Sequence, residues 1–226
     1  MISPIHVLKR IPLFASLSET DHMRLVGLLR RERLKKGEVL FRQGDEGSTL
    51  YLILQGRIRI SLSRRTDTVT LAILDQGDFL GEMALLDGLP RSADAEALEN
   101  SCLYALNRKD FLSFLTENQK AVREVLSAIS RRLRKADDLY AEMCFLNVSV
   151  RLARRLVEMS EQQPYDEKTS DECRVKISQR ELGNILGVSR ESINKELKRL
   201  REKGIVSTSR NHVQIHDVAF LKRQAS

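Results

Sequence analysis

Short apolar runs that alternate with polar positions fill the chain from Glu38 to about Leu106. A period of two is typical of β-strands, and glycines at or near the joins supply the turns. The runs are Val39–Phe41, Leu50–Leu54, Arg57–Leu62, Val69–Leu74 and Cys102–Leu106, and the glycines are Gly37, Gly44, Gly47, Gly56 and Gly77. This pattern predicts a double-sheet β-roll related to the jelly roll, although a generic β-sandwich fits the strands equally well.

The pattern becomes helical on both sides of these strands. Residues 9–32 predict short helices around Pro12 and the acid-capped segment Ser18–Asp21. From Glu117 to Asn147, apolar residues are spaced alternately four and three apart, at Val122, Leu126, Ile129, Leu133, Ala136, Tyr140 and Met143. An a/d stripe sustained over three heptads predicts a long helix that pairs with a second copy in a parallel homodimer. Packing within the chain is the alternative.

The C-terminal third predicts three helices and a hairpin. The elements are a helix over 149–163, a surface loop over 162–172, a helix from the capping box Ser178–Glu181 to Leu186, and a helix from Ser189 to about Lys203. Ser178 and Ser189 are N-cap residues, and Gly187 between the last two helices permits a left-handed turn. This order describes a helix-turn-helix, and the hairpin over 205–216 would be its wing.

The last of these helices has the residue types that read DNA bases. Its first turn presents Ser189, Arg190 and Glu191, and Lys195 lies further along the same face. A recognition helix enters the major groove with its N-terminus first. There Arg190 and Lys195 can bind guanine and Glu191 can accept from cytosine, while Ser207–Arg210 of the wing can contact phosphates. A basic helix that is only a solvated surface is the alternative.

Charge and cysteine content narrow the class of protein. The net charge is +7, and residues 1–146 carry 22 basic and 20 acidic side chains against 16 and 11 in residues 147–226. The basic excess is therefore concentrated where DNA contact is expected. The three cysteines are too few and too scattered for a disulfide framework, and no apolar run is long enough for a signal peptide or a membrane span. We expect a cytoplasmic protein with no membrane partner.

The stretch Phe79–Ala93 carries the chemistry of a nucleotide site. Glu82 and Arg91 lie at the two ends of a predicted loop-helix-loop, and glycines at 77, 81 and 88 let the backbone approach a ligand. A carboxylate can accept a sugar hydroxyl, and an arginine beside free backbone N–H groups can bind a phosphate. The stretch resembles the phosphate-binding cassette of cyclic-nucleotide-binding domains.

When the stretch Phe79–Ala93 and the C-terminal helix-turn-helix are taken together, nearly the whole chain resembles the cyclic-AMP receptor / fumarate-nitrate-reductase regulator (CRP/FNR) family. The resemblance is carried by Gly37–Asp45, Tyr51–Ile58, Phe79–Ala93, Phe145–Val148 and Val188–Ser192. It implies an α+β homodimeric transcription factor. The expected parts are an N-terminal cyclic-nucleotide-binding-like double-sheet β-roll over residues 1–116, a dimerisation helix over 117–147, and a C-terminal winged helix-turn-helix over 148–226.

The resemblance also implies site residues. Gly81, Glu82, Met83 and Ala84 would bind ribose and phosphate, and Arg91, Ser92 and Ala93 the cyclic phosphate. Glu82 would accept the ribose 2′-hydroxyl and Arg91 would neutralise the phosphate. In the alternative, an unliganded roll, these two side chains only pair with each other. The residues expected to contact DNA, at a palindrome of TGTGA-like half-sites, are Ser178, Gln179, Ser189, Arg190, Glu191, Lys195 and Arg210.

The base of the effector is a separate question. Two adjacent hydroxyl residues reach the adenine in cyclic-AMP receptors, and the aligned residues here are Ala136 and Asp137, with Arg132 retained one turn earlier. Ala136 makes no side-chain hydrogen bond, and ionised Asp137 is only an acceptor, which suits the N1–H and N2–H₂ edge of guanine. Cyclic AMP is the first expected effector, and cyclic GMP or cyclic di-GMP the next. Alternatively, Asp137 pairs with an arginine across the dimer.

The sequence is compatible with three functions. The first is a ligand-gated regulator that binds double-stranded DNA and contacts RNA polymerase, without a permanent cofactor. The second is an enzyme around Glu82 and Asp87, but no nucleophile, metal cluster or paired base accompanies them, so we expect no catalytic residue and no metal site. The third is a regulator governed by redox state or by abundance. The iron–sulfur and haem sensors of the family are disfavoured because the cysteine cluster and suitable axial ligands are missing.

Overall fold

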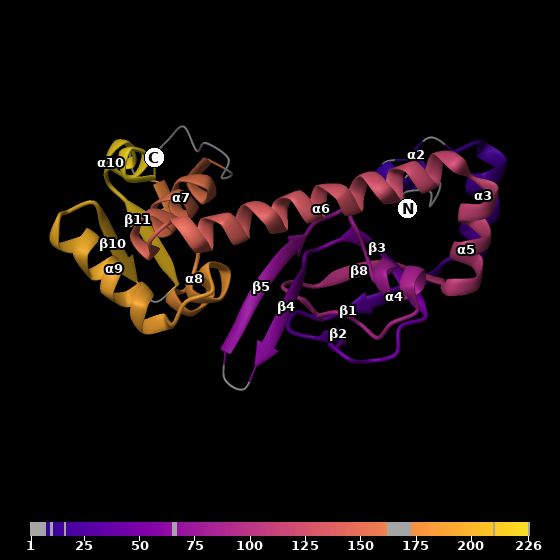
Figure 1. Cartoon of the computed structure of the whole chain (residues 1–226), viewed down its shortest axis with the longest axis horizontal. Helices are drawn as coiled ribbons and strands as arrows, with labels where there is room; N and C mark the ends of the chain where they lie inside the picture. The colour runs from indigo at the N-terminus through magenta and orange to yellow at the C-terminus, as the bar shows by residue number, and fades with distance from the viewer. Residues whose placement is uncertain are drawn as a thin grey trace. The chain divides into compact units, whose positions relative to one another are not determined.

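The structure, a computed structural model, describes residues 8–9, 11–15, 17–64, 67–161, 173–209 and 211–225 (Figure 1). Its backbone divides into two compact units, residues 1–62 with 71–135 and residues 63–70 with 136–226. The long helix α6, Gln119–Phe145, runs through the division as one element (Figure 1).

Two four-stranded sheets, formed by described residues, lie chiefly in the first unit; residues 63–64 and 67–70 of one sheet belong to the second unit. Their orders are β1-β8-β3-β6 and β2-β7-β4-β5. The strands are β1 Arg30–Leu34, β2 Val39–Phe41, β3 Thr49–Gln55, β4 Ile58–Arg64, β5 Asp67–Leu74, β6 Phe79–Leu80, β7 Asp94–Ala97 and β8 Ser101–Asn107. The helices are α2 Pro12–Ala15, α3 Glu19–Leu28, α4 Glu82–Asp87 and α5 Arg108–Glu117. The predicted β-roll and the α+β class are confirmed.

The alternation seen along the strands places one set of side chains in an apolar core. Ile53, Ile58 and Leu103 are fully buried, and they pack with Ala95 and Ala97 of β7. A second cluster includes Leu50 and Leu52 of β3 together with Phe14, Leu25 and Phe111 of the helices. These side chains lie on both sides of the sheet that contains β3. Their burial stabilises the roll, because apolar surface on each face of that sheet is removed from water.

Helix α6 carries two different faces. Ala121, Val125 and Ala128 are buried and belong to the core cluster that contains the N-terminal helices. The predicted a/d stripe lies mostly on another face, where Leu126 is exposed by 59%, Leu133 by 61%, Tyr140 by 71% and Met143 by 45%, whereas Ile129 of the stripe is partly buried and packs against the same core cluster. Contact within the described part of the chain accounts for Ile129 but leaves the other four large side chains exposed. Exposed apolar area in this amount is typical of a surface that meets a partner.

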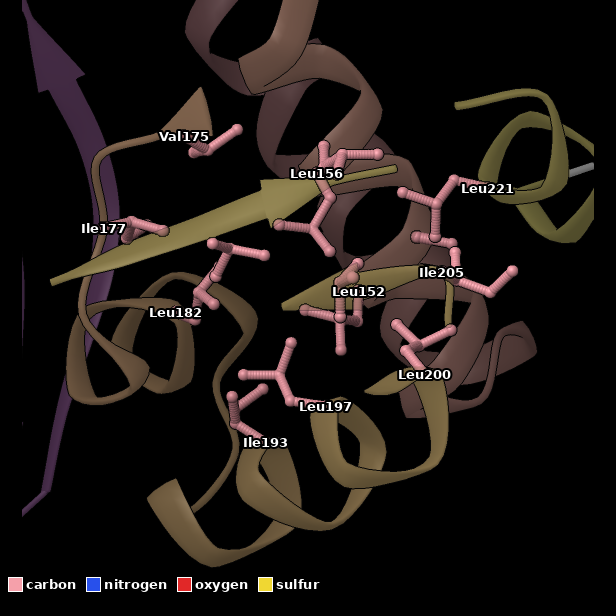
Figure 2. Close-up of a cluster of buried hydrophobic side chains, with 14 of the residues drawn as sticks. Leu152, Leu156, Val175, Ile177, Leu182, Ile193, Leu197, Leu200, Ile205 and Leu221 are labelled. Carbon is pink, nitrogen blue, oxygen red and sulfur yellow. The ribbon is translucent and has the colours of Figure 1, made fainter. Parts of the chain in front are cut away.

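The described residues of the second unit from Val148 onward form four helices and a three-stranded sheet. The elements are α7 Val148–Glu161, β9 Cys173–Val175, α8 Gln179–Leu186, α9 Arg190–Glu202, β10 Val206–Ser209, β11 His212–Ile215 and α10 Val218–Ala225. The sheet order is β10-β11-β9. Figure 2 shows Leu152 and Leu156 of α7, Ile193 and Leu197 of α9 and Leu221 of α10 gathered in one apolar core. The predicted helix-turn-helix and wing are confirmed.

Several elements differ from the sequence prediction. The expectation of short helices through residue 32 is wrong at its end, because Arg30–Leu34 is the edge strand β1, in which only Leu34 is buried. The helix predicted from Glu117 begins at Gln119, since Asn118 ends α5 in a non-helical conformation. Strands β6, β7 and β9 and helices α5 and α10 were not predicted. The predicted loop over 162–172 lies outside the described residues.

Within the described ranges, none of the helices combines the length and the hydropathy that crossing a bilayer requires.

Two glycines with similar backbone angles allow a matched stability test. Gly56 has φ +94°, and a Cβ there would lie 2.7 Å from the backbone Cα of Ser101; Gly37 has φ +83° and open space. We expect Gly37→Ala to lose about 1–2 kcal/mol through left-handed strain alone, and Gly56→Ala to lose at least about 3 kcal/mol, because steric overlap adds to that strain. Hydrogen exchange of the β3 and β8 amides measures both losses. Equal losses would contradict the overlap at Ser101.

Candidate functional site

The short helix α4 begins and ends at left-handed glycines. Gly81 precedes it with φ +86° and Gly88 follows it with φ +74°. A Cβ on Gly81 would lie 2.8 Å from the Thr49 carbonyl oxygen and 2.5 Å from a guanidinium nitrogen of Arg91. The site therefore needs glycine at this position, both for the backbone angle and for the close approach. The helix places Glu82, which is 3% exposed, as its first residue.

Arg91 is held in a buried position by backbone oxygens. Nη1 donates to the Gly81 carbonyl at 2.9 Å and Nη2 donates to the Thr49 carbonyl at 2.8 Å. The guanidinium carbon lies 4.3 Å from the centre of the Phe41 ring. Arg91 is only 5% exposed, and its Nε makes no hydrogen bond to any residue that the structure describes. Burial lowers the pKa of this guanidinium, opposed chiefly by Tyr51.

Glu82 pairs with the long helix instead of with Arg91. Arg132 of α6 donates from Nη1 to Oε1 of Glu82 at 2.7 Å and from Nη2 to the Phe79 carbonyl. Its guanidinium carbon lies 4.9 Å from the centre of the Phe79 ring. The alternative in which Glu82 and Arg91 only pair with each other is therefore wrong for this structure. The reason is that each side chain already has closer partners, Arg132 for the carboxylate and two carbonyls for Arg91.

The remaining predicted ligand residues lie around this group. Met83 is half exposed, Ala84 and Ala93 are buried, and the Ser92 hydroxyl lies 3.5 Å from the Met83 sulfur. Asp137 is exposed and lies five positions after Arg132 on α6. The structure thus brings Gly81, Glu82, Arg91 and Arg132 together, while the roles proposed for all nine residues stay predictions.

Residues that sequence reasoning did not single out fix the position of Arg91. Its backbone N–H donates to the Asp45 carbonyl at 2.8 Å, and the Gly44 N–H donates to the Arg91 carbonyl at 2.9 Å. A Cβ on Gly47 would lie 2.8 Å from Nε of Arg91. Gly44 and Asp45 belong to the stretch Gly37–Asp45 that carried the family resemblance, which was the available signal.

In the second unit, two serine caps set the geometry of the helix-turn-helix. Ser178 accepts from the Glu181 N–H and Ser189 accepts from the Ser192 N–H, each at 3.1 Å. Gly187 between them has φ +63°. Because Ile193, Leu197 and Leu200 are buried in the core, α9 presents its other face to solvent. There Arg190, Glu191 and Lys195 are exposed, as base reading requires.

Close packing holds the turn between α8 and α9. A Cβ on Gly183 would lie 2.8 Å from the Val188 carbonyl oxygen, so the glycine permits this approach. From α7, Arg151 donates to the Leu186 carbonyl at 2.9 Å, at the C-terminal end of α8. Arg151 is 9% exposed and was missed by sequence reasoning, because nothing in its spacing distinguishes it from the other arginines of α7.

A hollow of about 560 Å³ lies at the junction of α8, α9 and the wing. Its lining residues are Ser178, Gln179, Arg180, Arg190, Arg201, Thr208, Ser209 and Asn211. The first two and Arg190 are predicted DNA contacts, whereas Arg180 and Arg201 are additional. Arg210, another predicted contact, lies outside the described residues.

Both halves of the chain match known families. Residues 31–118 match the cyclic nucleotide-binding domain, and residues 150–224 match the Crp-like helix-turn-helix domain. The Cyclic AMP receptor protein of Thermus thermophilus is 31% identical over 221 residues, which cover 96% of this chain and 98% of that protein. A CRP-like cAMP-activated global transcriptional regulator of Mycobacterium tuberculosis is 25% identical, with 97% and 98% covered.

A solved structure gives the same fold. The c-di-GMP responsive global regulator CLP of Xanthomonas campestris superposes with a TM-score of 0.80 at 21% identity, and the match covers 88% of this chain and all of that chain. At this identity the likeness concerns the fold alone.

The N-cap of α9 can be tested with two neighbouring serines. Ser189→Ala removes the acceptor of the Ser192 N–H, whereas Ser192→Ala keeps that N–H and its acceptor. We expect the first substitution to lower the stability of the first turn of α9 by about 1 kcal/mol, which corresponds to about fivefold faster amide exchange. Exchange of the residue-192 amide in the two variants measures the difference. Equal exchange rates would show that the cap contributes nothing.

Proposed function

Because the chain belongs to the CRP/FNR family of transcription regulators, we propose that a cyclic nucleotide bound at α4 and Arg91 controls its affinity for an operator. The chain is a regulator with a cyclic nucleotide-binding domain and a DNA-binding helix-turn-helix. One observation carries the proposal: a buried carboxylate and a buried guanidinium flank the same short helix, and the carboxylate is tied to α6.

Glu82 and Arg91 would bind different parts of the nucleotide. Arg132 takes Oε1 of Glu82, and the other carboxylate oxygen is the acceptor that we assign to the ribose 2′-hydroxyl. Arg91 supplies a fixed positive charge to the cyclic phosphate, and its unpartnered Nε is the donor that the backbone leaves unused. Charge-assisted hydrogen bonds of this kind are stronger than neutral ones, particularly away from bulk water.

Coupling to DNA follows from the Glu82–Arg132 pair. A ligand that bonds to Glu82 changes the environment of Arg132, which is part of α6. The ligand shifts the protein toward DNA binding only to the extent that it binds that state more tightly. By linkage, operator DNA raises the affinity for the ligand by the same factor.

Dimer formation completes the proposal. The exposed stripe on α6 supports pairing with the same helix of a second copy, as in a parallel coiled coil. A twofold dimer presents two α9 helices to a palindromic duplex, whose half-sites lie about 34 Å apart. Contact with RNA polymerase belongs to the same proposal and rests on family membership.

Two relatives support cyclic AMP as the first candidate effector, because their names state activation by or reception of cyclic AMP. Asp137 favours a guanine base instead, since an ionised carboxylate accepts from N1–H and N2–H₂. On a regular helix Asp137 lies about 7.5 Å along the axis and about 140° around it from Arg132, so the two side chains face different sides of α6. An ion pair between Asp137 and an arginine of the second copy is the competing role.

Nucleotide binding is tested by thermal unfolding of the full chain. At a hundredfold excess over Kd, a ligand of the folded state adds about 2.7 kcal/mol, so we expect the melting temperature to rise by about 5–10 °C. Arg91→Gln should abolish the rise, while Arg57→Gln, which changes an exposed arginine of the same unit by the same charge, should not. The assay is run separately with cyclic AMP, cyclic GMP and cyclic di-GMP.

Asp137→Ala separates the candidate bases in the same assay. If the wild type responds to a guanine nucleotide and the variant loses that response, the guanine assignment is supported. A response to cyclic AMP alone that Asp137→Ala leaves unchanged would retire it. No response to any of the three nucleotides would overturn the sensor proposal.

The dimer seam is tested with two equally exposed apolar residues. Leu133 of α6 is 61% exposed and Met23 of α3 is 58% exposed, but only Leu133 belongs to the a/d stripe. We expect Leu133→Glu to raise the dimer dissociation constant at least about a hundredfold, because two carboxylates would meet in an apolar seam. Met23→Glu should leave it unchanged. Light scattering over a protein dilution series measures both, and a dimeric Leu133→Glu variant would refute the seam.

A further inference from the structure

Arg132 and Asp137 of α6 lie on opposite sides of the apolar stripe. We infer that Arg132 of one copy forms an ion pair with Asp137 of a second copy, and that this pair sets the direction and register in which the two helices meet. The inference rests on the dimer of the proposed function. It goes beyond that proposal by naming the contact and by placing Asp137 in the dimer seam and not at the nucleotide base.

The apolar stripe itself defines the heptad positions of α6. Its a positions are Leu126, Leu133 and Tyr140, and its d positions are Val122, Ile129, Ala136 and Met143. Arg132 directly precedes an a residue and is therefore a g residue, while Asp137 directly follows a d residue and is an e residue. The two are about 140° apart around the helix, and Leu133 and Ala136 of the stripe lie between them. Arg132 and Asp137 therefore border the seam from its two sides.

Pairing of two parallel helices brings these two positions together. In a parallel coiled coil, a g residue faces the e residue five positions further along the other helix. Position 132 of each copy then faces position 137 of the other, so a twofold dimer contains the contact twice. The remaining g and e residues that face each other within α6 are Val125 with Ser130 and Leu139 with Cys144, and none of these is Asp, Glu, Lys or Arg. Along the described helix, the charged g–e pair is therefore Arg132 with Asp137.

Within the described residues, Asp137 pairs with no cation of its own chain. Its side chain is exposed, and no basic group there lies within ion-pair distance of its carboxylate. Arg134 is three positions before it on the same helix, a spacing at which ion pairs form, yet the two side chains are not paired. An exposed carboxylate beside an apolar stripe is thus available to a cation that a second copy brings.

Arg132 can bond to a second carboxylate without losing the first. Nη1 donates to Glu82 and Nη2 donates to the Phe79 carbonyl, and the side chain stays 35% exposed. A guanidinium has five N–H donors, so these two bonds leave three for another acceptor. Val125, the g residue one heptad earlier, is buried in the core cluster of the roll. The g side of α6 therefore borders both the roll and the seam, which lets one arginine serve both.

The pair would connect the nucleotide site to the dimer seam through one guanidinium. Glu82 is the carboxylate that we assign to the ribose hydroxyl, and Arg132 is its partner at 2.7 Å. A ligand that bonds to Glu82 therefore acts on the seam pair through a single side chain. By linkage, nucleotide binding and dimerisation then change each other's free energy by the same amount.

Charge reversal at one position tests the pair. Asp137→Arg sets two arginines against each other at both contacts, so we expect the dimer dissociation constant of the full chain to rise at least about tenfold at low salt. The rise should shrink with added salt, which screens exposed charges. Asp138→Arg is the matched control, because it makes the same charge change at the adjacent exposed f position and should change the constant by less than about threefold. Light scattering over a protein dilution series measures all three proteins.

A mixture of complementary reversals tests the partner of Asp137. Arg132→Asp sets two carboxylates against each other, so this variant should dimerise as poorly as Asp137→Arg. When the two variants are mixed, a mixed dimer has the native pair at one contact and the reversed pair at the other, and both attract. Native mass spectrometry should therefore show mixed dimers well above the half that random pairing gives.

A milder set of variants keeps the test valid if Arg132→Asp unfolds the roll. Arg132→Gln retains an N–H donor for Glu82, and Asp137→Asn retains the shape of the side chain without its charge. The two single variants and the double variant form a double-mutant cycle on the dimer dissociation constant. We expect the double variant to weaken the dimer less than the product of the single effects, by at least about threefold.

The outcomes separate this inference from the proposed function. An unchanged dissociation constant in Asp137→Arg, random pairing in the mixture, or independent effects in the cycle would each overturn the ion pair and leave the proposed function standing. Loss of a guanine-nucleotide response in Asp137→Asn with an unchanged dimer would return this residue to base reading. A wild type that stays monomeric throughout the dilution series would overturn the proposed dimer and this inference together.

Discussion

The ion pair between Glu82 and Arg132 is the interaction on which the chemistry of the first unit depends. It uses one oxygen of a carboxylate that is almost entirely buried, and it joins the first residue of α4 to α6 at 2.7 Å. A buried carboxylate without a partner would be strongly unfavourable, so the pair determines which way Glu82 faces. Because Glu82 pairs with Arg132, Arg91 is positioned by its hydrogen bonds to two backbone carbonyls instead.

The division of α6 into two faces lets one helix serve two purposes. Ala121, Val125 and Ala128 are small enough for close packing in the core cluster, and they are spaced for that face alone. The larger Leu126 and Leu133 lie on another face and stay exposed. A helix with a single apolar stripe could not belong to the core of the roll and also offer an intact seam to a partner.

Most of the fold was predictable from the sequence, because strong periodicity and capping residues act locally. The strands β2 to β5 and β8 alternate clearly, and Ser178, Gly187 and Ser189 define the helix-turn-helix. Strand β1 was missed because four of its five residues are charged and only pairing with β8 makes it a strand. Strand β7, Asp94–Ala97, was missed because alanine has a low strand propensity and buries little area.

The candidate site was predictable in its charged members but not in its arrangement. Glu82 and Arg91 stand out by residue type and spacing, whereas the partner of Glu82 lies 50 positions away and one of the two carbonyl partners of Arg91 lies 42 away. Long-range contacts of this kind depend on sheet topology, which no local pattern encodes. For the same reason Arg151 and Arg201 looked like ordinary surface arginines in the sequence, although one is buried and one is bonded to the wing.

The hydrogen bonds from Arg91 to two backbone carbonyls have a thermodynamic consequence. An arginine in solution samples many rotamers, and ordering one on binding loses up to about 2 kcal/mol of conformational entropy. Here Gly47, Phe41 and two carbonyls impose that order during folding, so the cation is preorganised before a ligand arrives. Substitutions behind the pocket that loosen this arginine would therefore weaken an anionic ligand without removing any contact to it.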